Sequence, residues 1–284
     1  MATNMTFPIE QGLRPLMKDL GIRADHVLRR AGMPDDLFSR PHGGLTTAEH
    51  FRLWQSIDTE AADPLLPLRM AEAIQAESFV PPLFAALCSA NMVQATQRLA
   101  TYKRLMVPMR LDVVIGSRGE LSLSPQWLDA KGETPFILEA SELAFLMRLV
   151  RMATREPVKA VKVTMPTLPA QSQARAYADY FGVSVRRDAD ACLTLSAVDA
   201  HRPFLTANDA MWQVFEPDLR RRLGALVTHV PLDEGLRLHG RRPHEARRTV
   251  RLALDRHGKD GERGVPQEVP HQGVALVLRH RPRP

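Results

Sequence analysis

Four side chains near the middle of the sequence have types that could hold a small polar molecule: Tyr102, Arg104, Arg110 and Trp127. They fall where a predicted helix meets a predicted hairpin, and an aromatic ring beside a charged group can orient such a ligand. The alternative is that Tyr102 and Trp127 only pack against the interior while the two arginines face solvent. The chemistry that we predict for these residues is therefore noncovalent binding of a small molecule.

A pair of carboxylates is the strongest candidate for catalysis. Glu139 and Glu142 are three residues apart on a predicted helix, and paired carboxylates can act as general acid and base. Carboxylates are rarely buried in proteins, so the ordinary interpretation is a solvated helix face. We predict such a face for both residues and assign neither a catalytic role.

The histidines and cysteines are too scattered to predict a metal or nucleophile site. Cys88 and Cys192 have no second ligand at metal spacing and are expected to be reduced and structural. The sequence also lacks the nucleophile-elbow, zinc-protease, phosphate-loop and calcium-loop motifs. We therefore predict no catalytic residue, no metal, no cofactor and no enzymatic activity. The histidines of the body, predicted to lie at the surface or to cap helices, are His26, His42, His50 and His201.

The N-terminal part of the chain has the periodicity of helices. Thr46 and Glu49 form a capping box at the start of one helix, and Asn91 can cap another. Apolar side chains recur every three or four positions, which predicts one face of each helix packed on a core. The predicted helices span residues 11–20, 24–31, 46–61, 65–76, 81–88 and 92–106.

The pattern becomes strand-like at Met109. Two apolar runs separated by the turn 116–119 predict a β-hairpin. A helix over 134–155 is apolar nearly all round, which predicts deep burial. The predicted fold class is therefore α+β, a helical N-terminal half followed by a small mixed β-sheet with helices. Strands are expected over 110–115, 120–124, 158–165, 183–185 and 192–196, and a further helix over 170–181.

A last helix begins after Asn208, whose side chain can cap it. Its apolar face predicts packing on the core, and the arginines at 220–222 are placed in its last turn, where they suit the helix dipole. The apolar residues of this face are Met211, Trp212, Phe215 and Leu219.

Charge is distributed unevenly along the 284 residues. The formal net charge is +6, and residues 224–284 contribute +5 of it through twelve cationic against seven acidic side chains. The body is nearly neutral, and its 44% hydrophobic content is enough for a core. No apolar run approaches the roughly 18 residues of a membrane span, and the N-terminus lacks a secretory pattern. We expect a cytoplasmic protein with no membrane partner.

Short motifs spread over the body have a distinctive order and spacing. They comprise Leu53-Trp54, Asp63-Pro64, residues 68–72, 177–185 and 201–203, and the closing signature Asn208, Trp212, Phe215, Glu216 and Pro217. Together they resemble the arabinose-binding-type effector domain of AraC/XylS-type transcription regulators, over about residues 7–223. The resemblance implies a domain, residues 1–223, that senses a small-molecule effector of unknown identity and forms a homodimer, with DNA as the family's further partner.

Residues 224–284 do not continue the resemblance. The family places two helix-turn-helix units there, but this segment lacks their recognition motifs and has no Ser, Asn, Phe, Tyr, Trp, Ile, Met or Cys. We predict a basic, largely disordered tail. A shifted reading frame in GC-rich DNA would give this bias toward Arg, Pro, Gly and His; the competing hypothesis is an authentic tail that touches phosphates without reading bases.

The sequence therefore predicts a ligand-responsive transcriptional regulator of the AraC type, with specific DNA binding in doubt for this chain. The alternative from another class is a small-molecule-binding or dimerisation module without DNA-binding activity. Sequence-specific DNA binding would separate the two.

Overall fold

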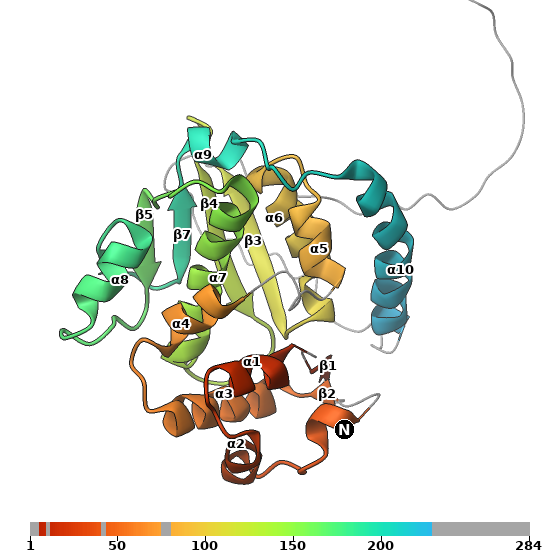
Figure 1. Ribbon diagram of the computed structural model, residues 1–284, viewed down its shortest axis with the longest axis vertical. Helices are drawn as coiled ribbons and strands as arrows, with labels where there is room; N and C mark the ends of the chain where they lie inside the picture. Colours follow the sequence, from red (N-terminus) through yellow and green to blue (C-terminus); the bar gives the residue numbers. More distant parts are fainter. Residues whose placement is uncertain (1–5, 10–11, 41–43, 75–80, 229–284) are drawn as a thin grey trace, which may run out of the picture. The chain divides into compact units, whose positions relative to one another are not determined.

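The computed structural model describes residues 6–9, 12–40, 44–74 and 81–228, all within one compact unit (Figure 1). Helices and strands are mixed, as predicted, so the α+β class is confirmed. The N-terminal elements are helical except for a short pair of strands. They are β1 (Phe7–Pro8), α1 (Leu13–Asp19), α2 (Ala24–Ala31), η1 (Leu37–Ser39), β2 (Gly44–Leu45), α3 (Thr47–Ala61) and α4 (Leu66–Ala73).

The first hydrophobic core lies among α1 to α4. The predicted capping box starts α3: the Glu49 N–H donates to Thr46 Oγ1 (3.3 Å), and the Thr46 N–H donates to Glu49 Oε2 (2.8 Å). Residues from α7, Ile137 and Leu138, complete this core, so the N-terminal helices pack against the centre of the domain. The pair β1–β2, which the sequence did not indicate, is antiparallel and only two residues long on each side.

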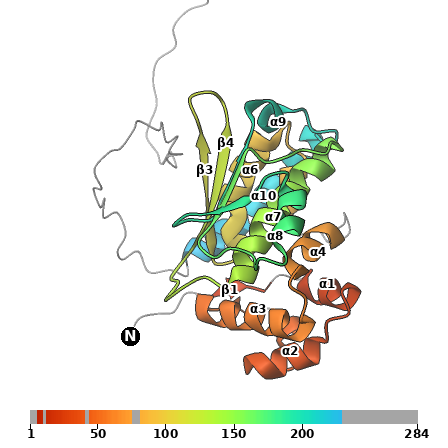
Figure 2. The same ribbon diagram turned by 90° about the vertical axis from the view of Figure 1, so that its left-hand side faces the viewer.

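The second core is built around a five-stranded sheet of order β3-β4-β7-β5-β6. All neighbours are antiparallel except β5 and β6, so the sheet is mixed. Helices α6 and α7 of this core lie on the same side of the β3–β4 hairpin (Figure 2). The elements are α5 (Pro81–Leu87), α6 (Met92–Tyr102), η3 (Lys103–Leu105), β3 (Met109–Ile115), β4 (Leu121–Trp127), α7 (Phe136–Thr154), β5 (Lys162–Met165), α8 (Ala174–Phe181), β6 (Val185–Arg187), β7 (Cys192–Leu195) and α9 (Ala197–His201).

Helix α7 contacts both cores because apolar residues lie on nearly all of its faces. It contacts α3, α4 and β7, and most of its side chains are buried. The deep burial predicted for 134–155 is therefore confirmed. A helix in this position can carry polar side chains into the interior from several directions.

Several predicted elements have different limits. The helix expected over 170–181 begins at Ala174, and the strand expected over 183–185 lies at Val185–Arg187. The strand expected from residue 158 begins at Lys162, because the Ala160 N–H bonds to the Phe181 carbonyl (2.8 Å) outside any strand ladder. The helix expected over 92–106 ends at Tyr102 and tightens into the 3₁₀ turn η3, where the Met106 N–H bonds to the Lys103 carbonyl (2.9 Å).

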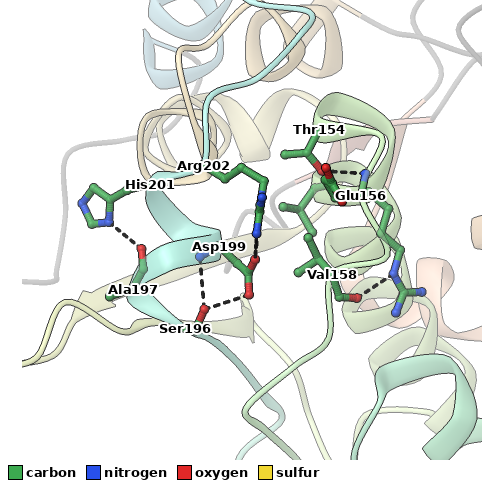
Figure 3. A network of polar contacts seen from close by, with 10 residues as sticks. Thr154, Glu156, Val158, Ser196, Ala197, Asp199, His201 and Arg202 are labelled. Carbon is green, nitrogen blue, oxygen red and sulfur yellow. Dashed lines mark hydrogen bonds and ion pairs between the residues drawn. The ribbon is translucent and has the colours of Figure 1, made fainter.

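Polar contacts fix the chain between β7 and α10 (Asp209–Thr228). Ser196 caps α9 by accepting from the Asp199 N–H (3.1 Å), and Arg202 pairs with the Asp199 carboxylate (3.0 Å), as Figure 3 shows. The Thr206 hydroxyl then donates to the Leu87 carbonyl (2.6 Å). These bonds hold the start of α10 against the end of α5.

Helix α10 packs on α5 through its apolar face (Figure 1). Leu219 is fully buried, while Trp212 and Phe215 are half-buried and Met211 is exposed. The helix continues to Thr228, so the prediction that the arginines at 220–222 occupy its last turn is wrong. They pair within the helix instead, Arg220 with Glu216 (2.7 Å) and Arg221 and Arg222 with Asp218. The predicted boundary at residue 223 falls inside this helix, and of the predicted tail, residues 229–284 lie outside the described part.

Candidate ligand-binding site

A cavity of about 90 Å³ lies between the N-terminal helices and the part of the chain that contains the five-stranded sheet. Its walls come from α1, α3, α4, α5, η3, β4 and α7, so segments far apart in the sequence meet there. The wall is mainly apolar. Among the apolar side chains are Leu13, Leu16, Met70, Leu83, Leu138 and Phe145.

Short contacts position the aromatic part of the wall. The Thr47 hydroxyl, at the start of α3, donates to the Leu128 carbonyl just after β4 (2.6 Å). This bond holds α3 against the end of the hairpin, where β4 places Trp127 opposite Met109. His50 and Trp54 follow on α3 at a spacing of four, which puts both on the same helix face.

These side chains form an aromatic cluster at the cavity. The His50 ring centre is 5.5 Å from that of Trp127 and 6.0 Å from that of Trp54, and Phe51 meets Trp127 edge-on at 5.4 Å. His50 is only 8% exposed, so its prediction as a surface or capping residue is wrong. Burial, with the Lys103 charge nearby, lowers the pKa of His50 to about 3, and the imidazole is neutral at physiological pH.

Four polar atoms of the wall are buried without a hydrogen-bond partner among the described residues. They are His50 Nε2, Trp54 Nε1, Trp127 Nε1 and Ser141 Oγ. Buried polar groups in folded proteins are almost always hydrogen-bonded. Four such atoms on residues that line one cavity are explained more simply by a polar ligand than by four separate packing defects.

One ion pair belongs to the same wall. Lys103 Nζ lies 2.6 Å from Glu142 Oε1, and the two side chains are 3% and 12% exposed. The ammonium is also 5.4 Å from the ring centre of Phe145, a distance at which a cation is attracted to an aromatic face. The solvated face predicted for Glu142 is therefore wrong, because α7 turns this carboxylate inward.

Glu139 is buried as well, outside the cavity wall. It is 7% exposed, and its Oε2 has no hydrogen-bond partner in the described part of the chain. Burial, followed by the charges of Asp190 and Glu133, raises the pKa of Glu139 to about 7. The solvated face predicted for this residue is also wrong, since α7 is enclosed on nearly every side.

The structure separates the four residues predicted to bind a ligand. Trp127 lines the cavity, whereas Tyr102 is buried against α10, with its ring centre 6.2 Å from that of Trp212. Arg110 is exposed and pairs with Asp112 on the same strand (2.7 Å). Arg104 is half-buried, and its Nε has no partner within the described ranges.

The residues of the closing signature lie at α10. Asn208 accepts from the Met211 N–H (3.0 Å), as a helix cap does. Trp212 and Phe215 pack on the neighbouring helices, and Pro217 lies within the helix. Trp54, also named as a structural signature residue, lines the cavity instead.

Sequence reasoning missed most of the polar wall. Lys103 lies between two of the proposed residues in the sequence, but it lines the cavity, and Tyr102 and Arg104 do not. His50 and Trp54 carried a usable signal, because a polar ring one helical turn before a tryptophan shares its buried face. Ser141 carried none that we can identify.

The remaining titratable clusters are ordinary. His26 pairs with Glu60 (2.8 Å), and His201 Nδ1 lies 3.0 Å from the Ala197 carbonyl at the surface; His42 lies outside the described residues. Cys88 and Cys192 are free. Within the described ranges, no group of three or more His, Cys, Asp or Glu side chains is placed to hold a metal ion. No helix there has the length and apolar character needed to span a membrane.

One family model matches most of the chain. A model described as the arabinose-binding domain of AraC transcription regulators, N-terminal, matches residues 21–204. The ornithine utilization regulator of Pseudomonas aeruginosa is 24% identical over 234 residues, which are 82% of this chain and 67% of that protein. The solved structure of the transcriptional regulator CdpR from Pseudomonas aeruginosa aligns with 80% of this chain and 72% of its own, at 18% identity and a TM-score of 0.49.

Proposed function

The chain belongs to the AraC transcription-regulator family through its arabinose-binding-type N-terminal domain, and from this premise we propose that it senses a small molecule inside the cavity. The observation that carries the proposal is that four residues lining a mainly apolar space each hold a buried polar atom with no hydrogen-bond partner among the described residues. Binding sites for small molecules have this composition, a mainly apolar wall with a few convergent polar groups.

The position of the cavity supports a sensing role. Its wall includes Leu83 of α5 and Lys103 of η3. The neighbouring residues Ala85 and Tyr102 form a second small cluster with Leu219 of α10. A ligand that moved α5 or η3 would therefore act directly on α10, which leads to residues 229–284.

The regulatory output is proposed to be transcriptional, as in the family. Residues 224–284 lack the recognition motifs that the family resemblance predicts. That observation favours a second candidate, a ligand-binding or dimerisation module that acts without binding DNA itself. Binding to labelled DNA at several salt concentrations separates the two, because contacts with phosphates alone weaken steeply with salt and show no sequence preference.

A thermal-shift screen of small molecules tests the sensing role. We expect at least one compound to raise the melting temperature of the full chain, since a ligand that binds only the folded state stabilises it. Ala71→Leu places a larger side chain in the cavity wall and should abolish the shift. Ala189→Leu makes the same change at an exposed position and should retain it. An equal shift in both variants would place binding elsewhere and reject the cavity.

A further inference from the structure

The cavity wall has balanced charge. Lys103 and Glu142 neutralise each other at 2.6 Å, and His50, the other titratable residue of the wall, is neutral. A ligand with a net charge would either remain uncompensated in a low-dielectric interior or draw one partner away from the other. Both outcomes are costly, because an isolated buried charge loses its hydration without replacement.

The polar atoms of the wall are mainly donors. The indole nitrogens of Trp54 and Trp127 can only donate, and both lack a partner among the described residues. Lys103 has three N–H groups, one of which is directed to Glu142. His50 and Ser141 can either donate or accept. Glu142 is the acceptor side chain of the wall and is already bonded to Lys103, so the two indole N–H groups are left for a ligand that supplies acceptor oxygen atoms.

The remaining side chains of the wall favour a ligand whose surface is mainly hydrocarbon. Leu13, Leu16, Met70, Leu138 and Phe145 offer no hydrogen bonds. The cavity volume of about 90 Å³ holds roughly six to nine water-sized groups, which is the scale of one substituted ring. A long acyl chain would exceed this volume.

We propose that the cavity binds an uncharged, compact, largely hydrocarbon molecule whose carbonyl or hydroxyl oxygen accepts hydrogen bonds from the indole N–H groups of Trp54 and Trp127. This inference rests on the proposed function, since it requires the cavity to be a ligand site. The Lys103–Glu142 pair remains intact when the ligand binds and serves to reject charged analogues. A carboxylate would compete with Glu142 for Lys103, and an amine would compete with Lys103 for Glu142.

The test uses four probes that share one ring and differ in polarity. Acetophenone is neutral with an acceptor oxygen, ethylbenzene is neutral without one, benzoate is an anion and benzylamine is a cation at neutral pH. Each is titrated into the full chain labelled with nitrogen-15, and the indole N–H signals are followed by NMR. The chain has three tryptophans, so Trp212→Phe identifies the signal outside the cavity and Trp127→Phe one of those inside it.

Acetophenone should move the indole signals of Trp54 and Trp127, leave that of Trp212 in place, and bind about tenfold more tightly than ethylbenzene, as expected for a hydrogen bond to a buried donor. Benzoate and benzylamine should bind more weakly than acetophenone. Trp127→Phe should remove most of the preference for acetophenone over ethylbenzene.

The contrary results are distinguishable. If benzoate or benzylamine binds more tightly than acetophenone, or if ethylbenzene binds as well, the ligand class is wrong while the cavity remains a sensor site. If no probe moves the signals of Trp54 and Trp127, the cavity does not admit these ring-sized molecules and this inference fails, while the thermal-shift comparison of Ala71→Leu with Ala189→Leu decides the proposed function separately.

Discussion

The cavity wall and the contact between α5 and α10 contain similar side chains, tryptophans and a cation. They differ in whether the polar groups have protein partners. At the α10 contact, Arg98 lies 4.0 Å from the ring centre of Trp212 and donates to the Ala85 carbonyl (3.2 Å) and to Ser89 Oγ (3.0 Å). Each of these groups has a protein partner. At the cavity, Trp54 and Trp127 line the same wall as Lys103, yet their indole nitrogens have no hydrogen-bond partner among the described residues.

The difference distinguishes a structural contact from the proposed ligand site. Side chains that satisfy one another hold two elements together, whereas the polar atoms at the proposed site have no partner among the described residues. Tyr102 and Lys103 show how closely the two regions approach each other in sequence. They are adjacent, but Tyr102 packs toward α10 and Lys103 lines the cavity.

Breaking the Lys103–Glu142 pair should have the largest effect on stability. Glu142→Gln leaves the buried ammonium without its counter-charge and should lower the free energy of unfolding by about 3 kcal/mol. The double variant Lys103→Met with Glu142→Gln removes both charges and should regain most of that loss. Urea unfolding measures both. A double variant no more stable than the single one would mean that the pair is not buried as described.

Glu139 is a buried carboxylate outside the cavity, and one of its oxygens has no partner among the described residues. It therefore contrasts with the unpartnered groups of the cavity wall. Its pKa is raised from 4.5 to about 7 in the folded chain, so the folded state binds the proton more tightly than the unfolded state does. The contribution of Glu139 to stability is therefore fully present below about pH 4.5 and is lost as the pH rises toward 7. Glu139→Gln should be more stable than the parent chain at pH 8, by on the order of 2 kcal/mol.

The Glu139→Gln advantage should shrink to nothing as the pH falls to the ordinary range of a glutamate. Thermal unfolding at a series of pH values measures the trend. The same variant should leave ligand affinity unchanged, because Glu139 does not line the cavity. A pH-independent difference in stability would contradict the burial of the charged form.

Weakening the contact between α5 and α10 should destabilise the fold less than breaking the Lys103–Glu142 pair. Trp212→Ala removes a half-buried ring that contacts Arg98 and Tyr102, and should lower the free energy of unfolding by roughly 1–2 kcal/mol. Ligand affinity, measured by calorimetry with a compound from the screen, should change little. If affinity fell as much as in a cavity variant, the two regions would not be separate sites.

The smallest stability change is expected from Trp127→Phe. Packing is largely retained and an unpartnered N–H is removed, so the free energy of unfolding should change by less than about 1 kcal/mol. Ligand affinity should nevertheless fall about tenfold, since one donor is lost. The matched substitution Trp212→Phe should preserve affinity. A loss of affinity in both variants would erase the distinction between the cavity and the α10 contact.

The sequence predicted features that depend on neighbouring residues. The Thr46–Glu49 capping box, the Asn91 and Asn208 caps and the 116–119 turn are local, because their hydrogen bonds join residues three or four apart. The apolar periodicity of 134–155 also predicted burial correctly. Local chemistry was enough in each case to place the element.

The cavity depended on pairings that no local pattern contains. Lys103 and Glu142 are 39 residues apart, and Thr47 meets the Leu128 carbonyl across 81 residues. Residues 103–105 form a 3₁₀ turn, where a continued helix had been expected. Composition statistics favoured an exposed Glu142, and the tertiary fold reversed that preference by supplying a buried partner.

A crystal structure of the purified full chain, at a resolution that shows individual atoms of a bound molecule, tests the central claim most directly. We predict electron density for a compact molecule in the cavity, with an oxygen atom within hydrogen-bonding distance of Trp54 Nε1 or Trp127 Nε1. A collapsed cavity, in which His50, Trp54, Trp127 and Ser141 hydrogen-bond to protein groups and leave no room for a ligand, would contradict it.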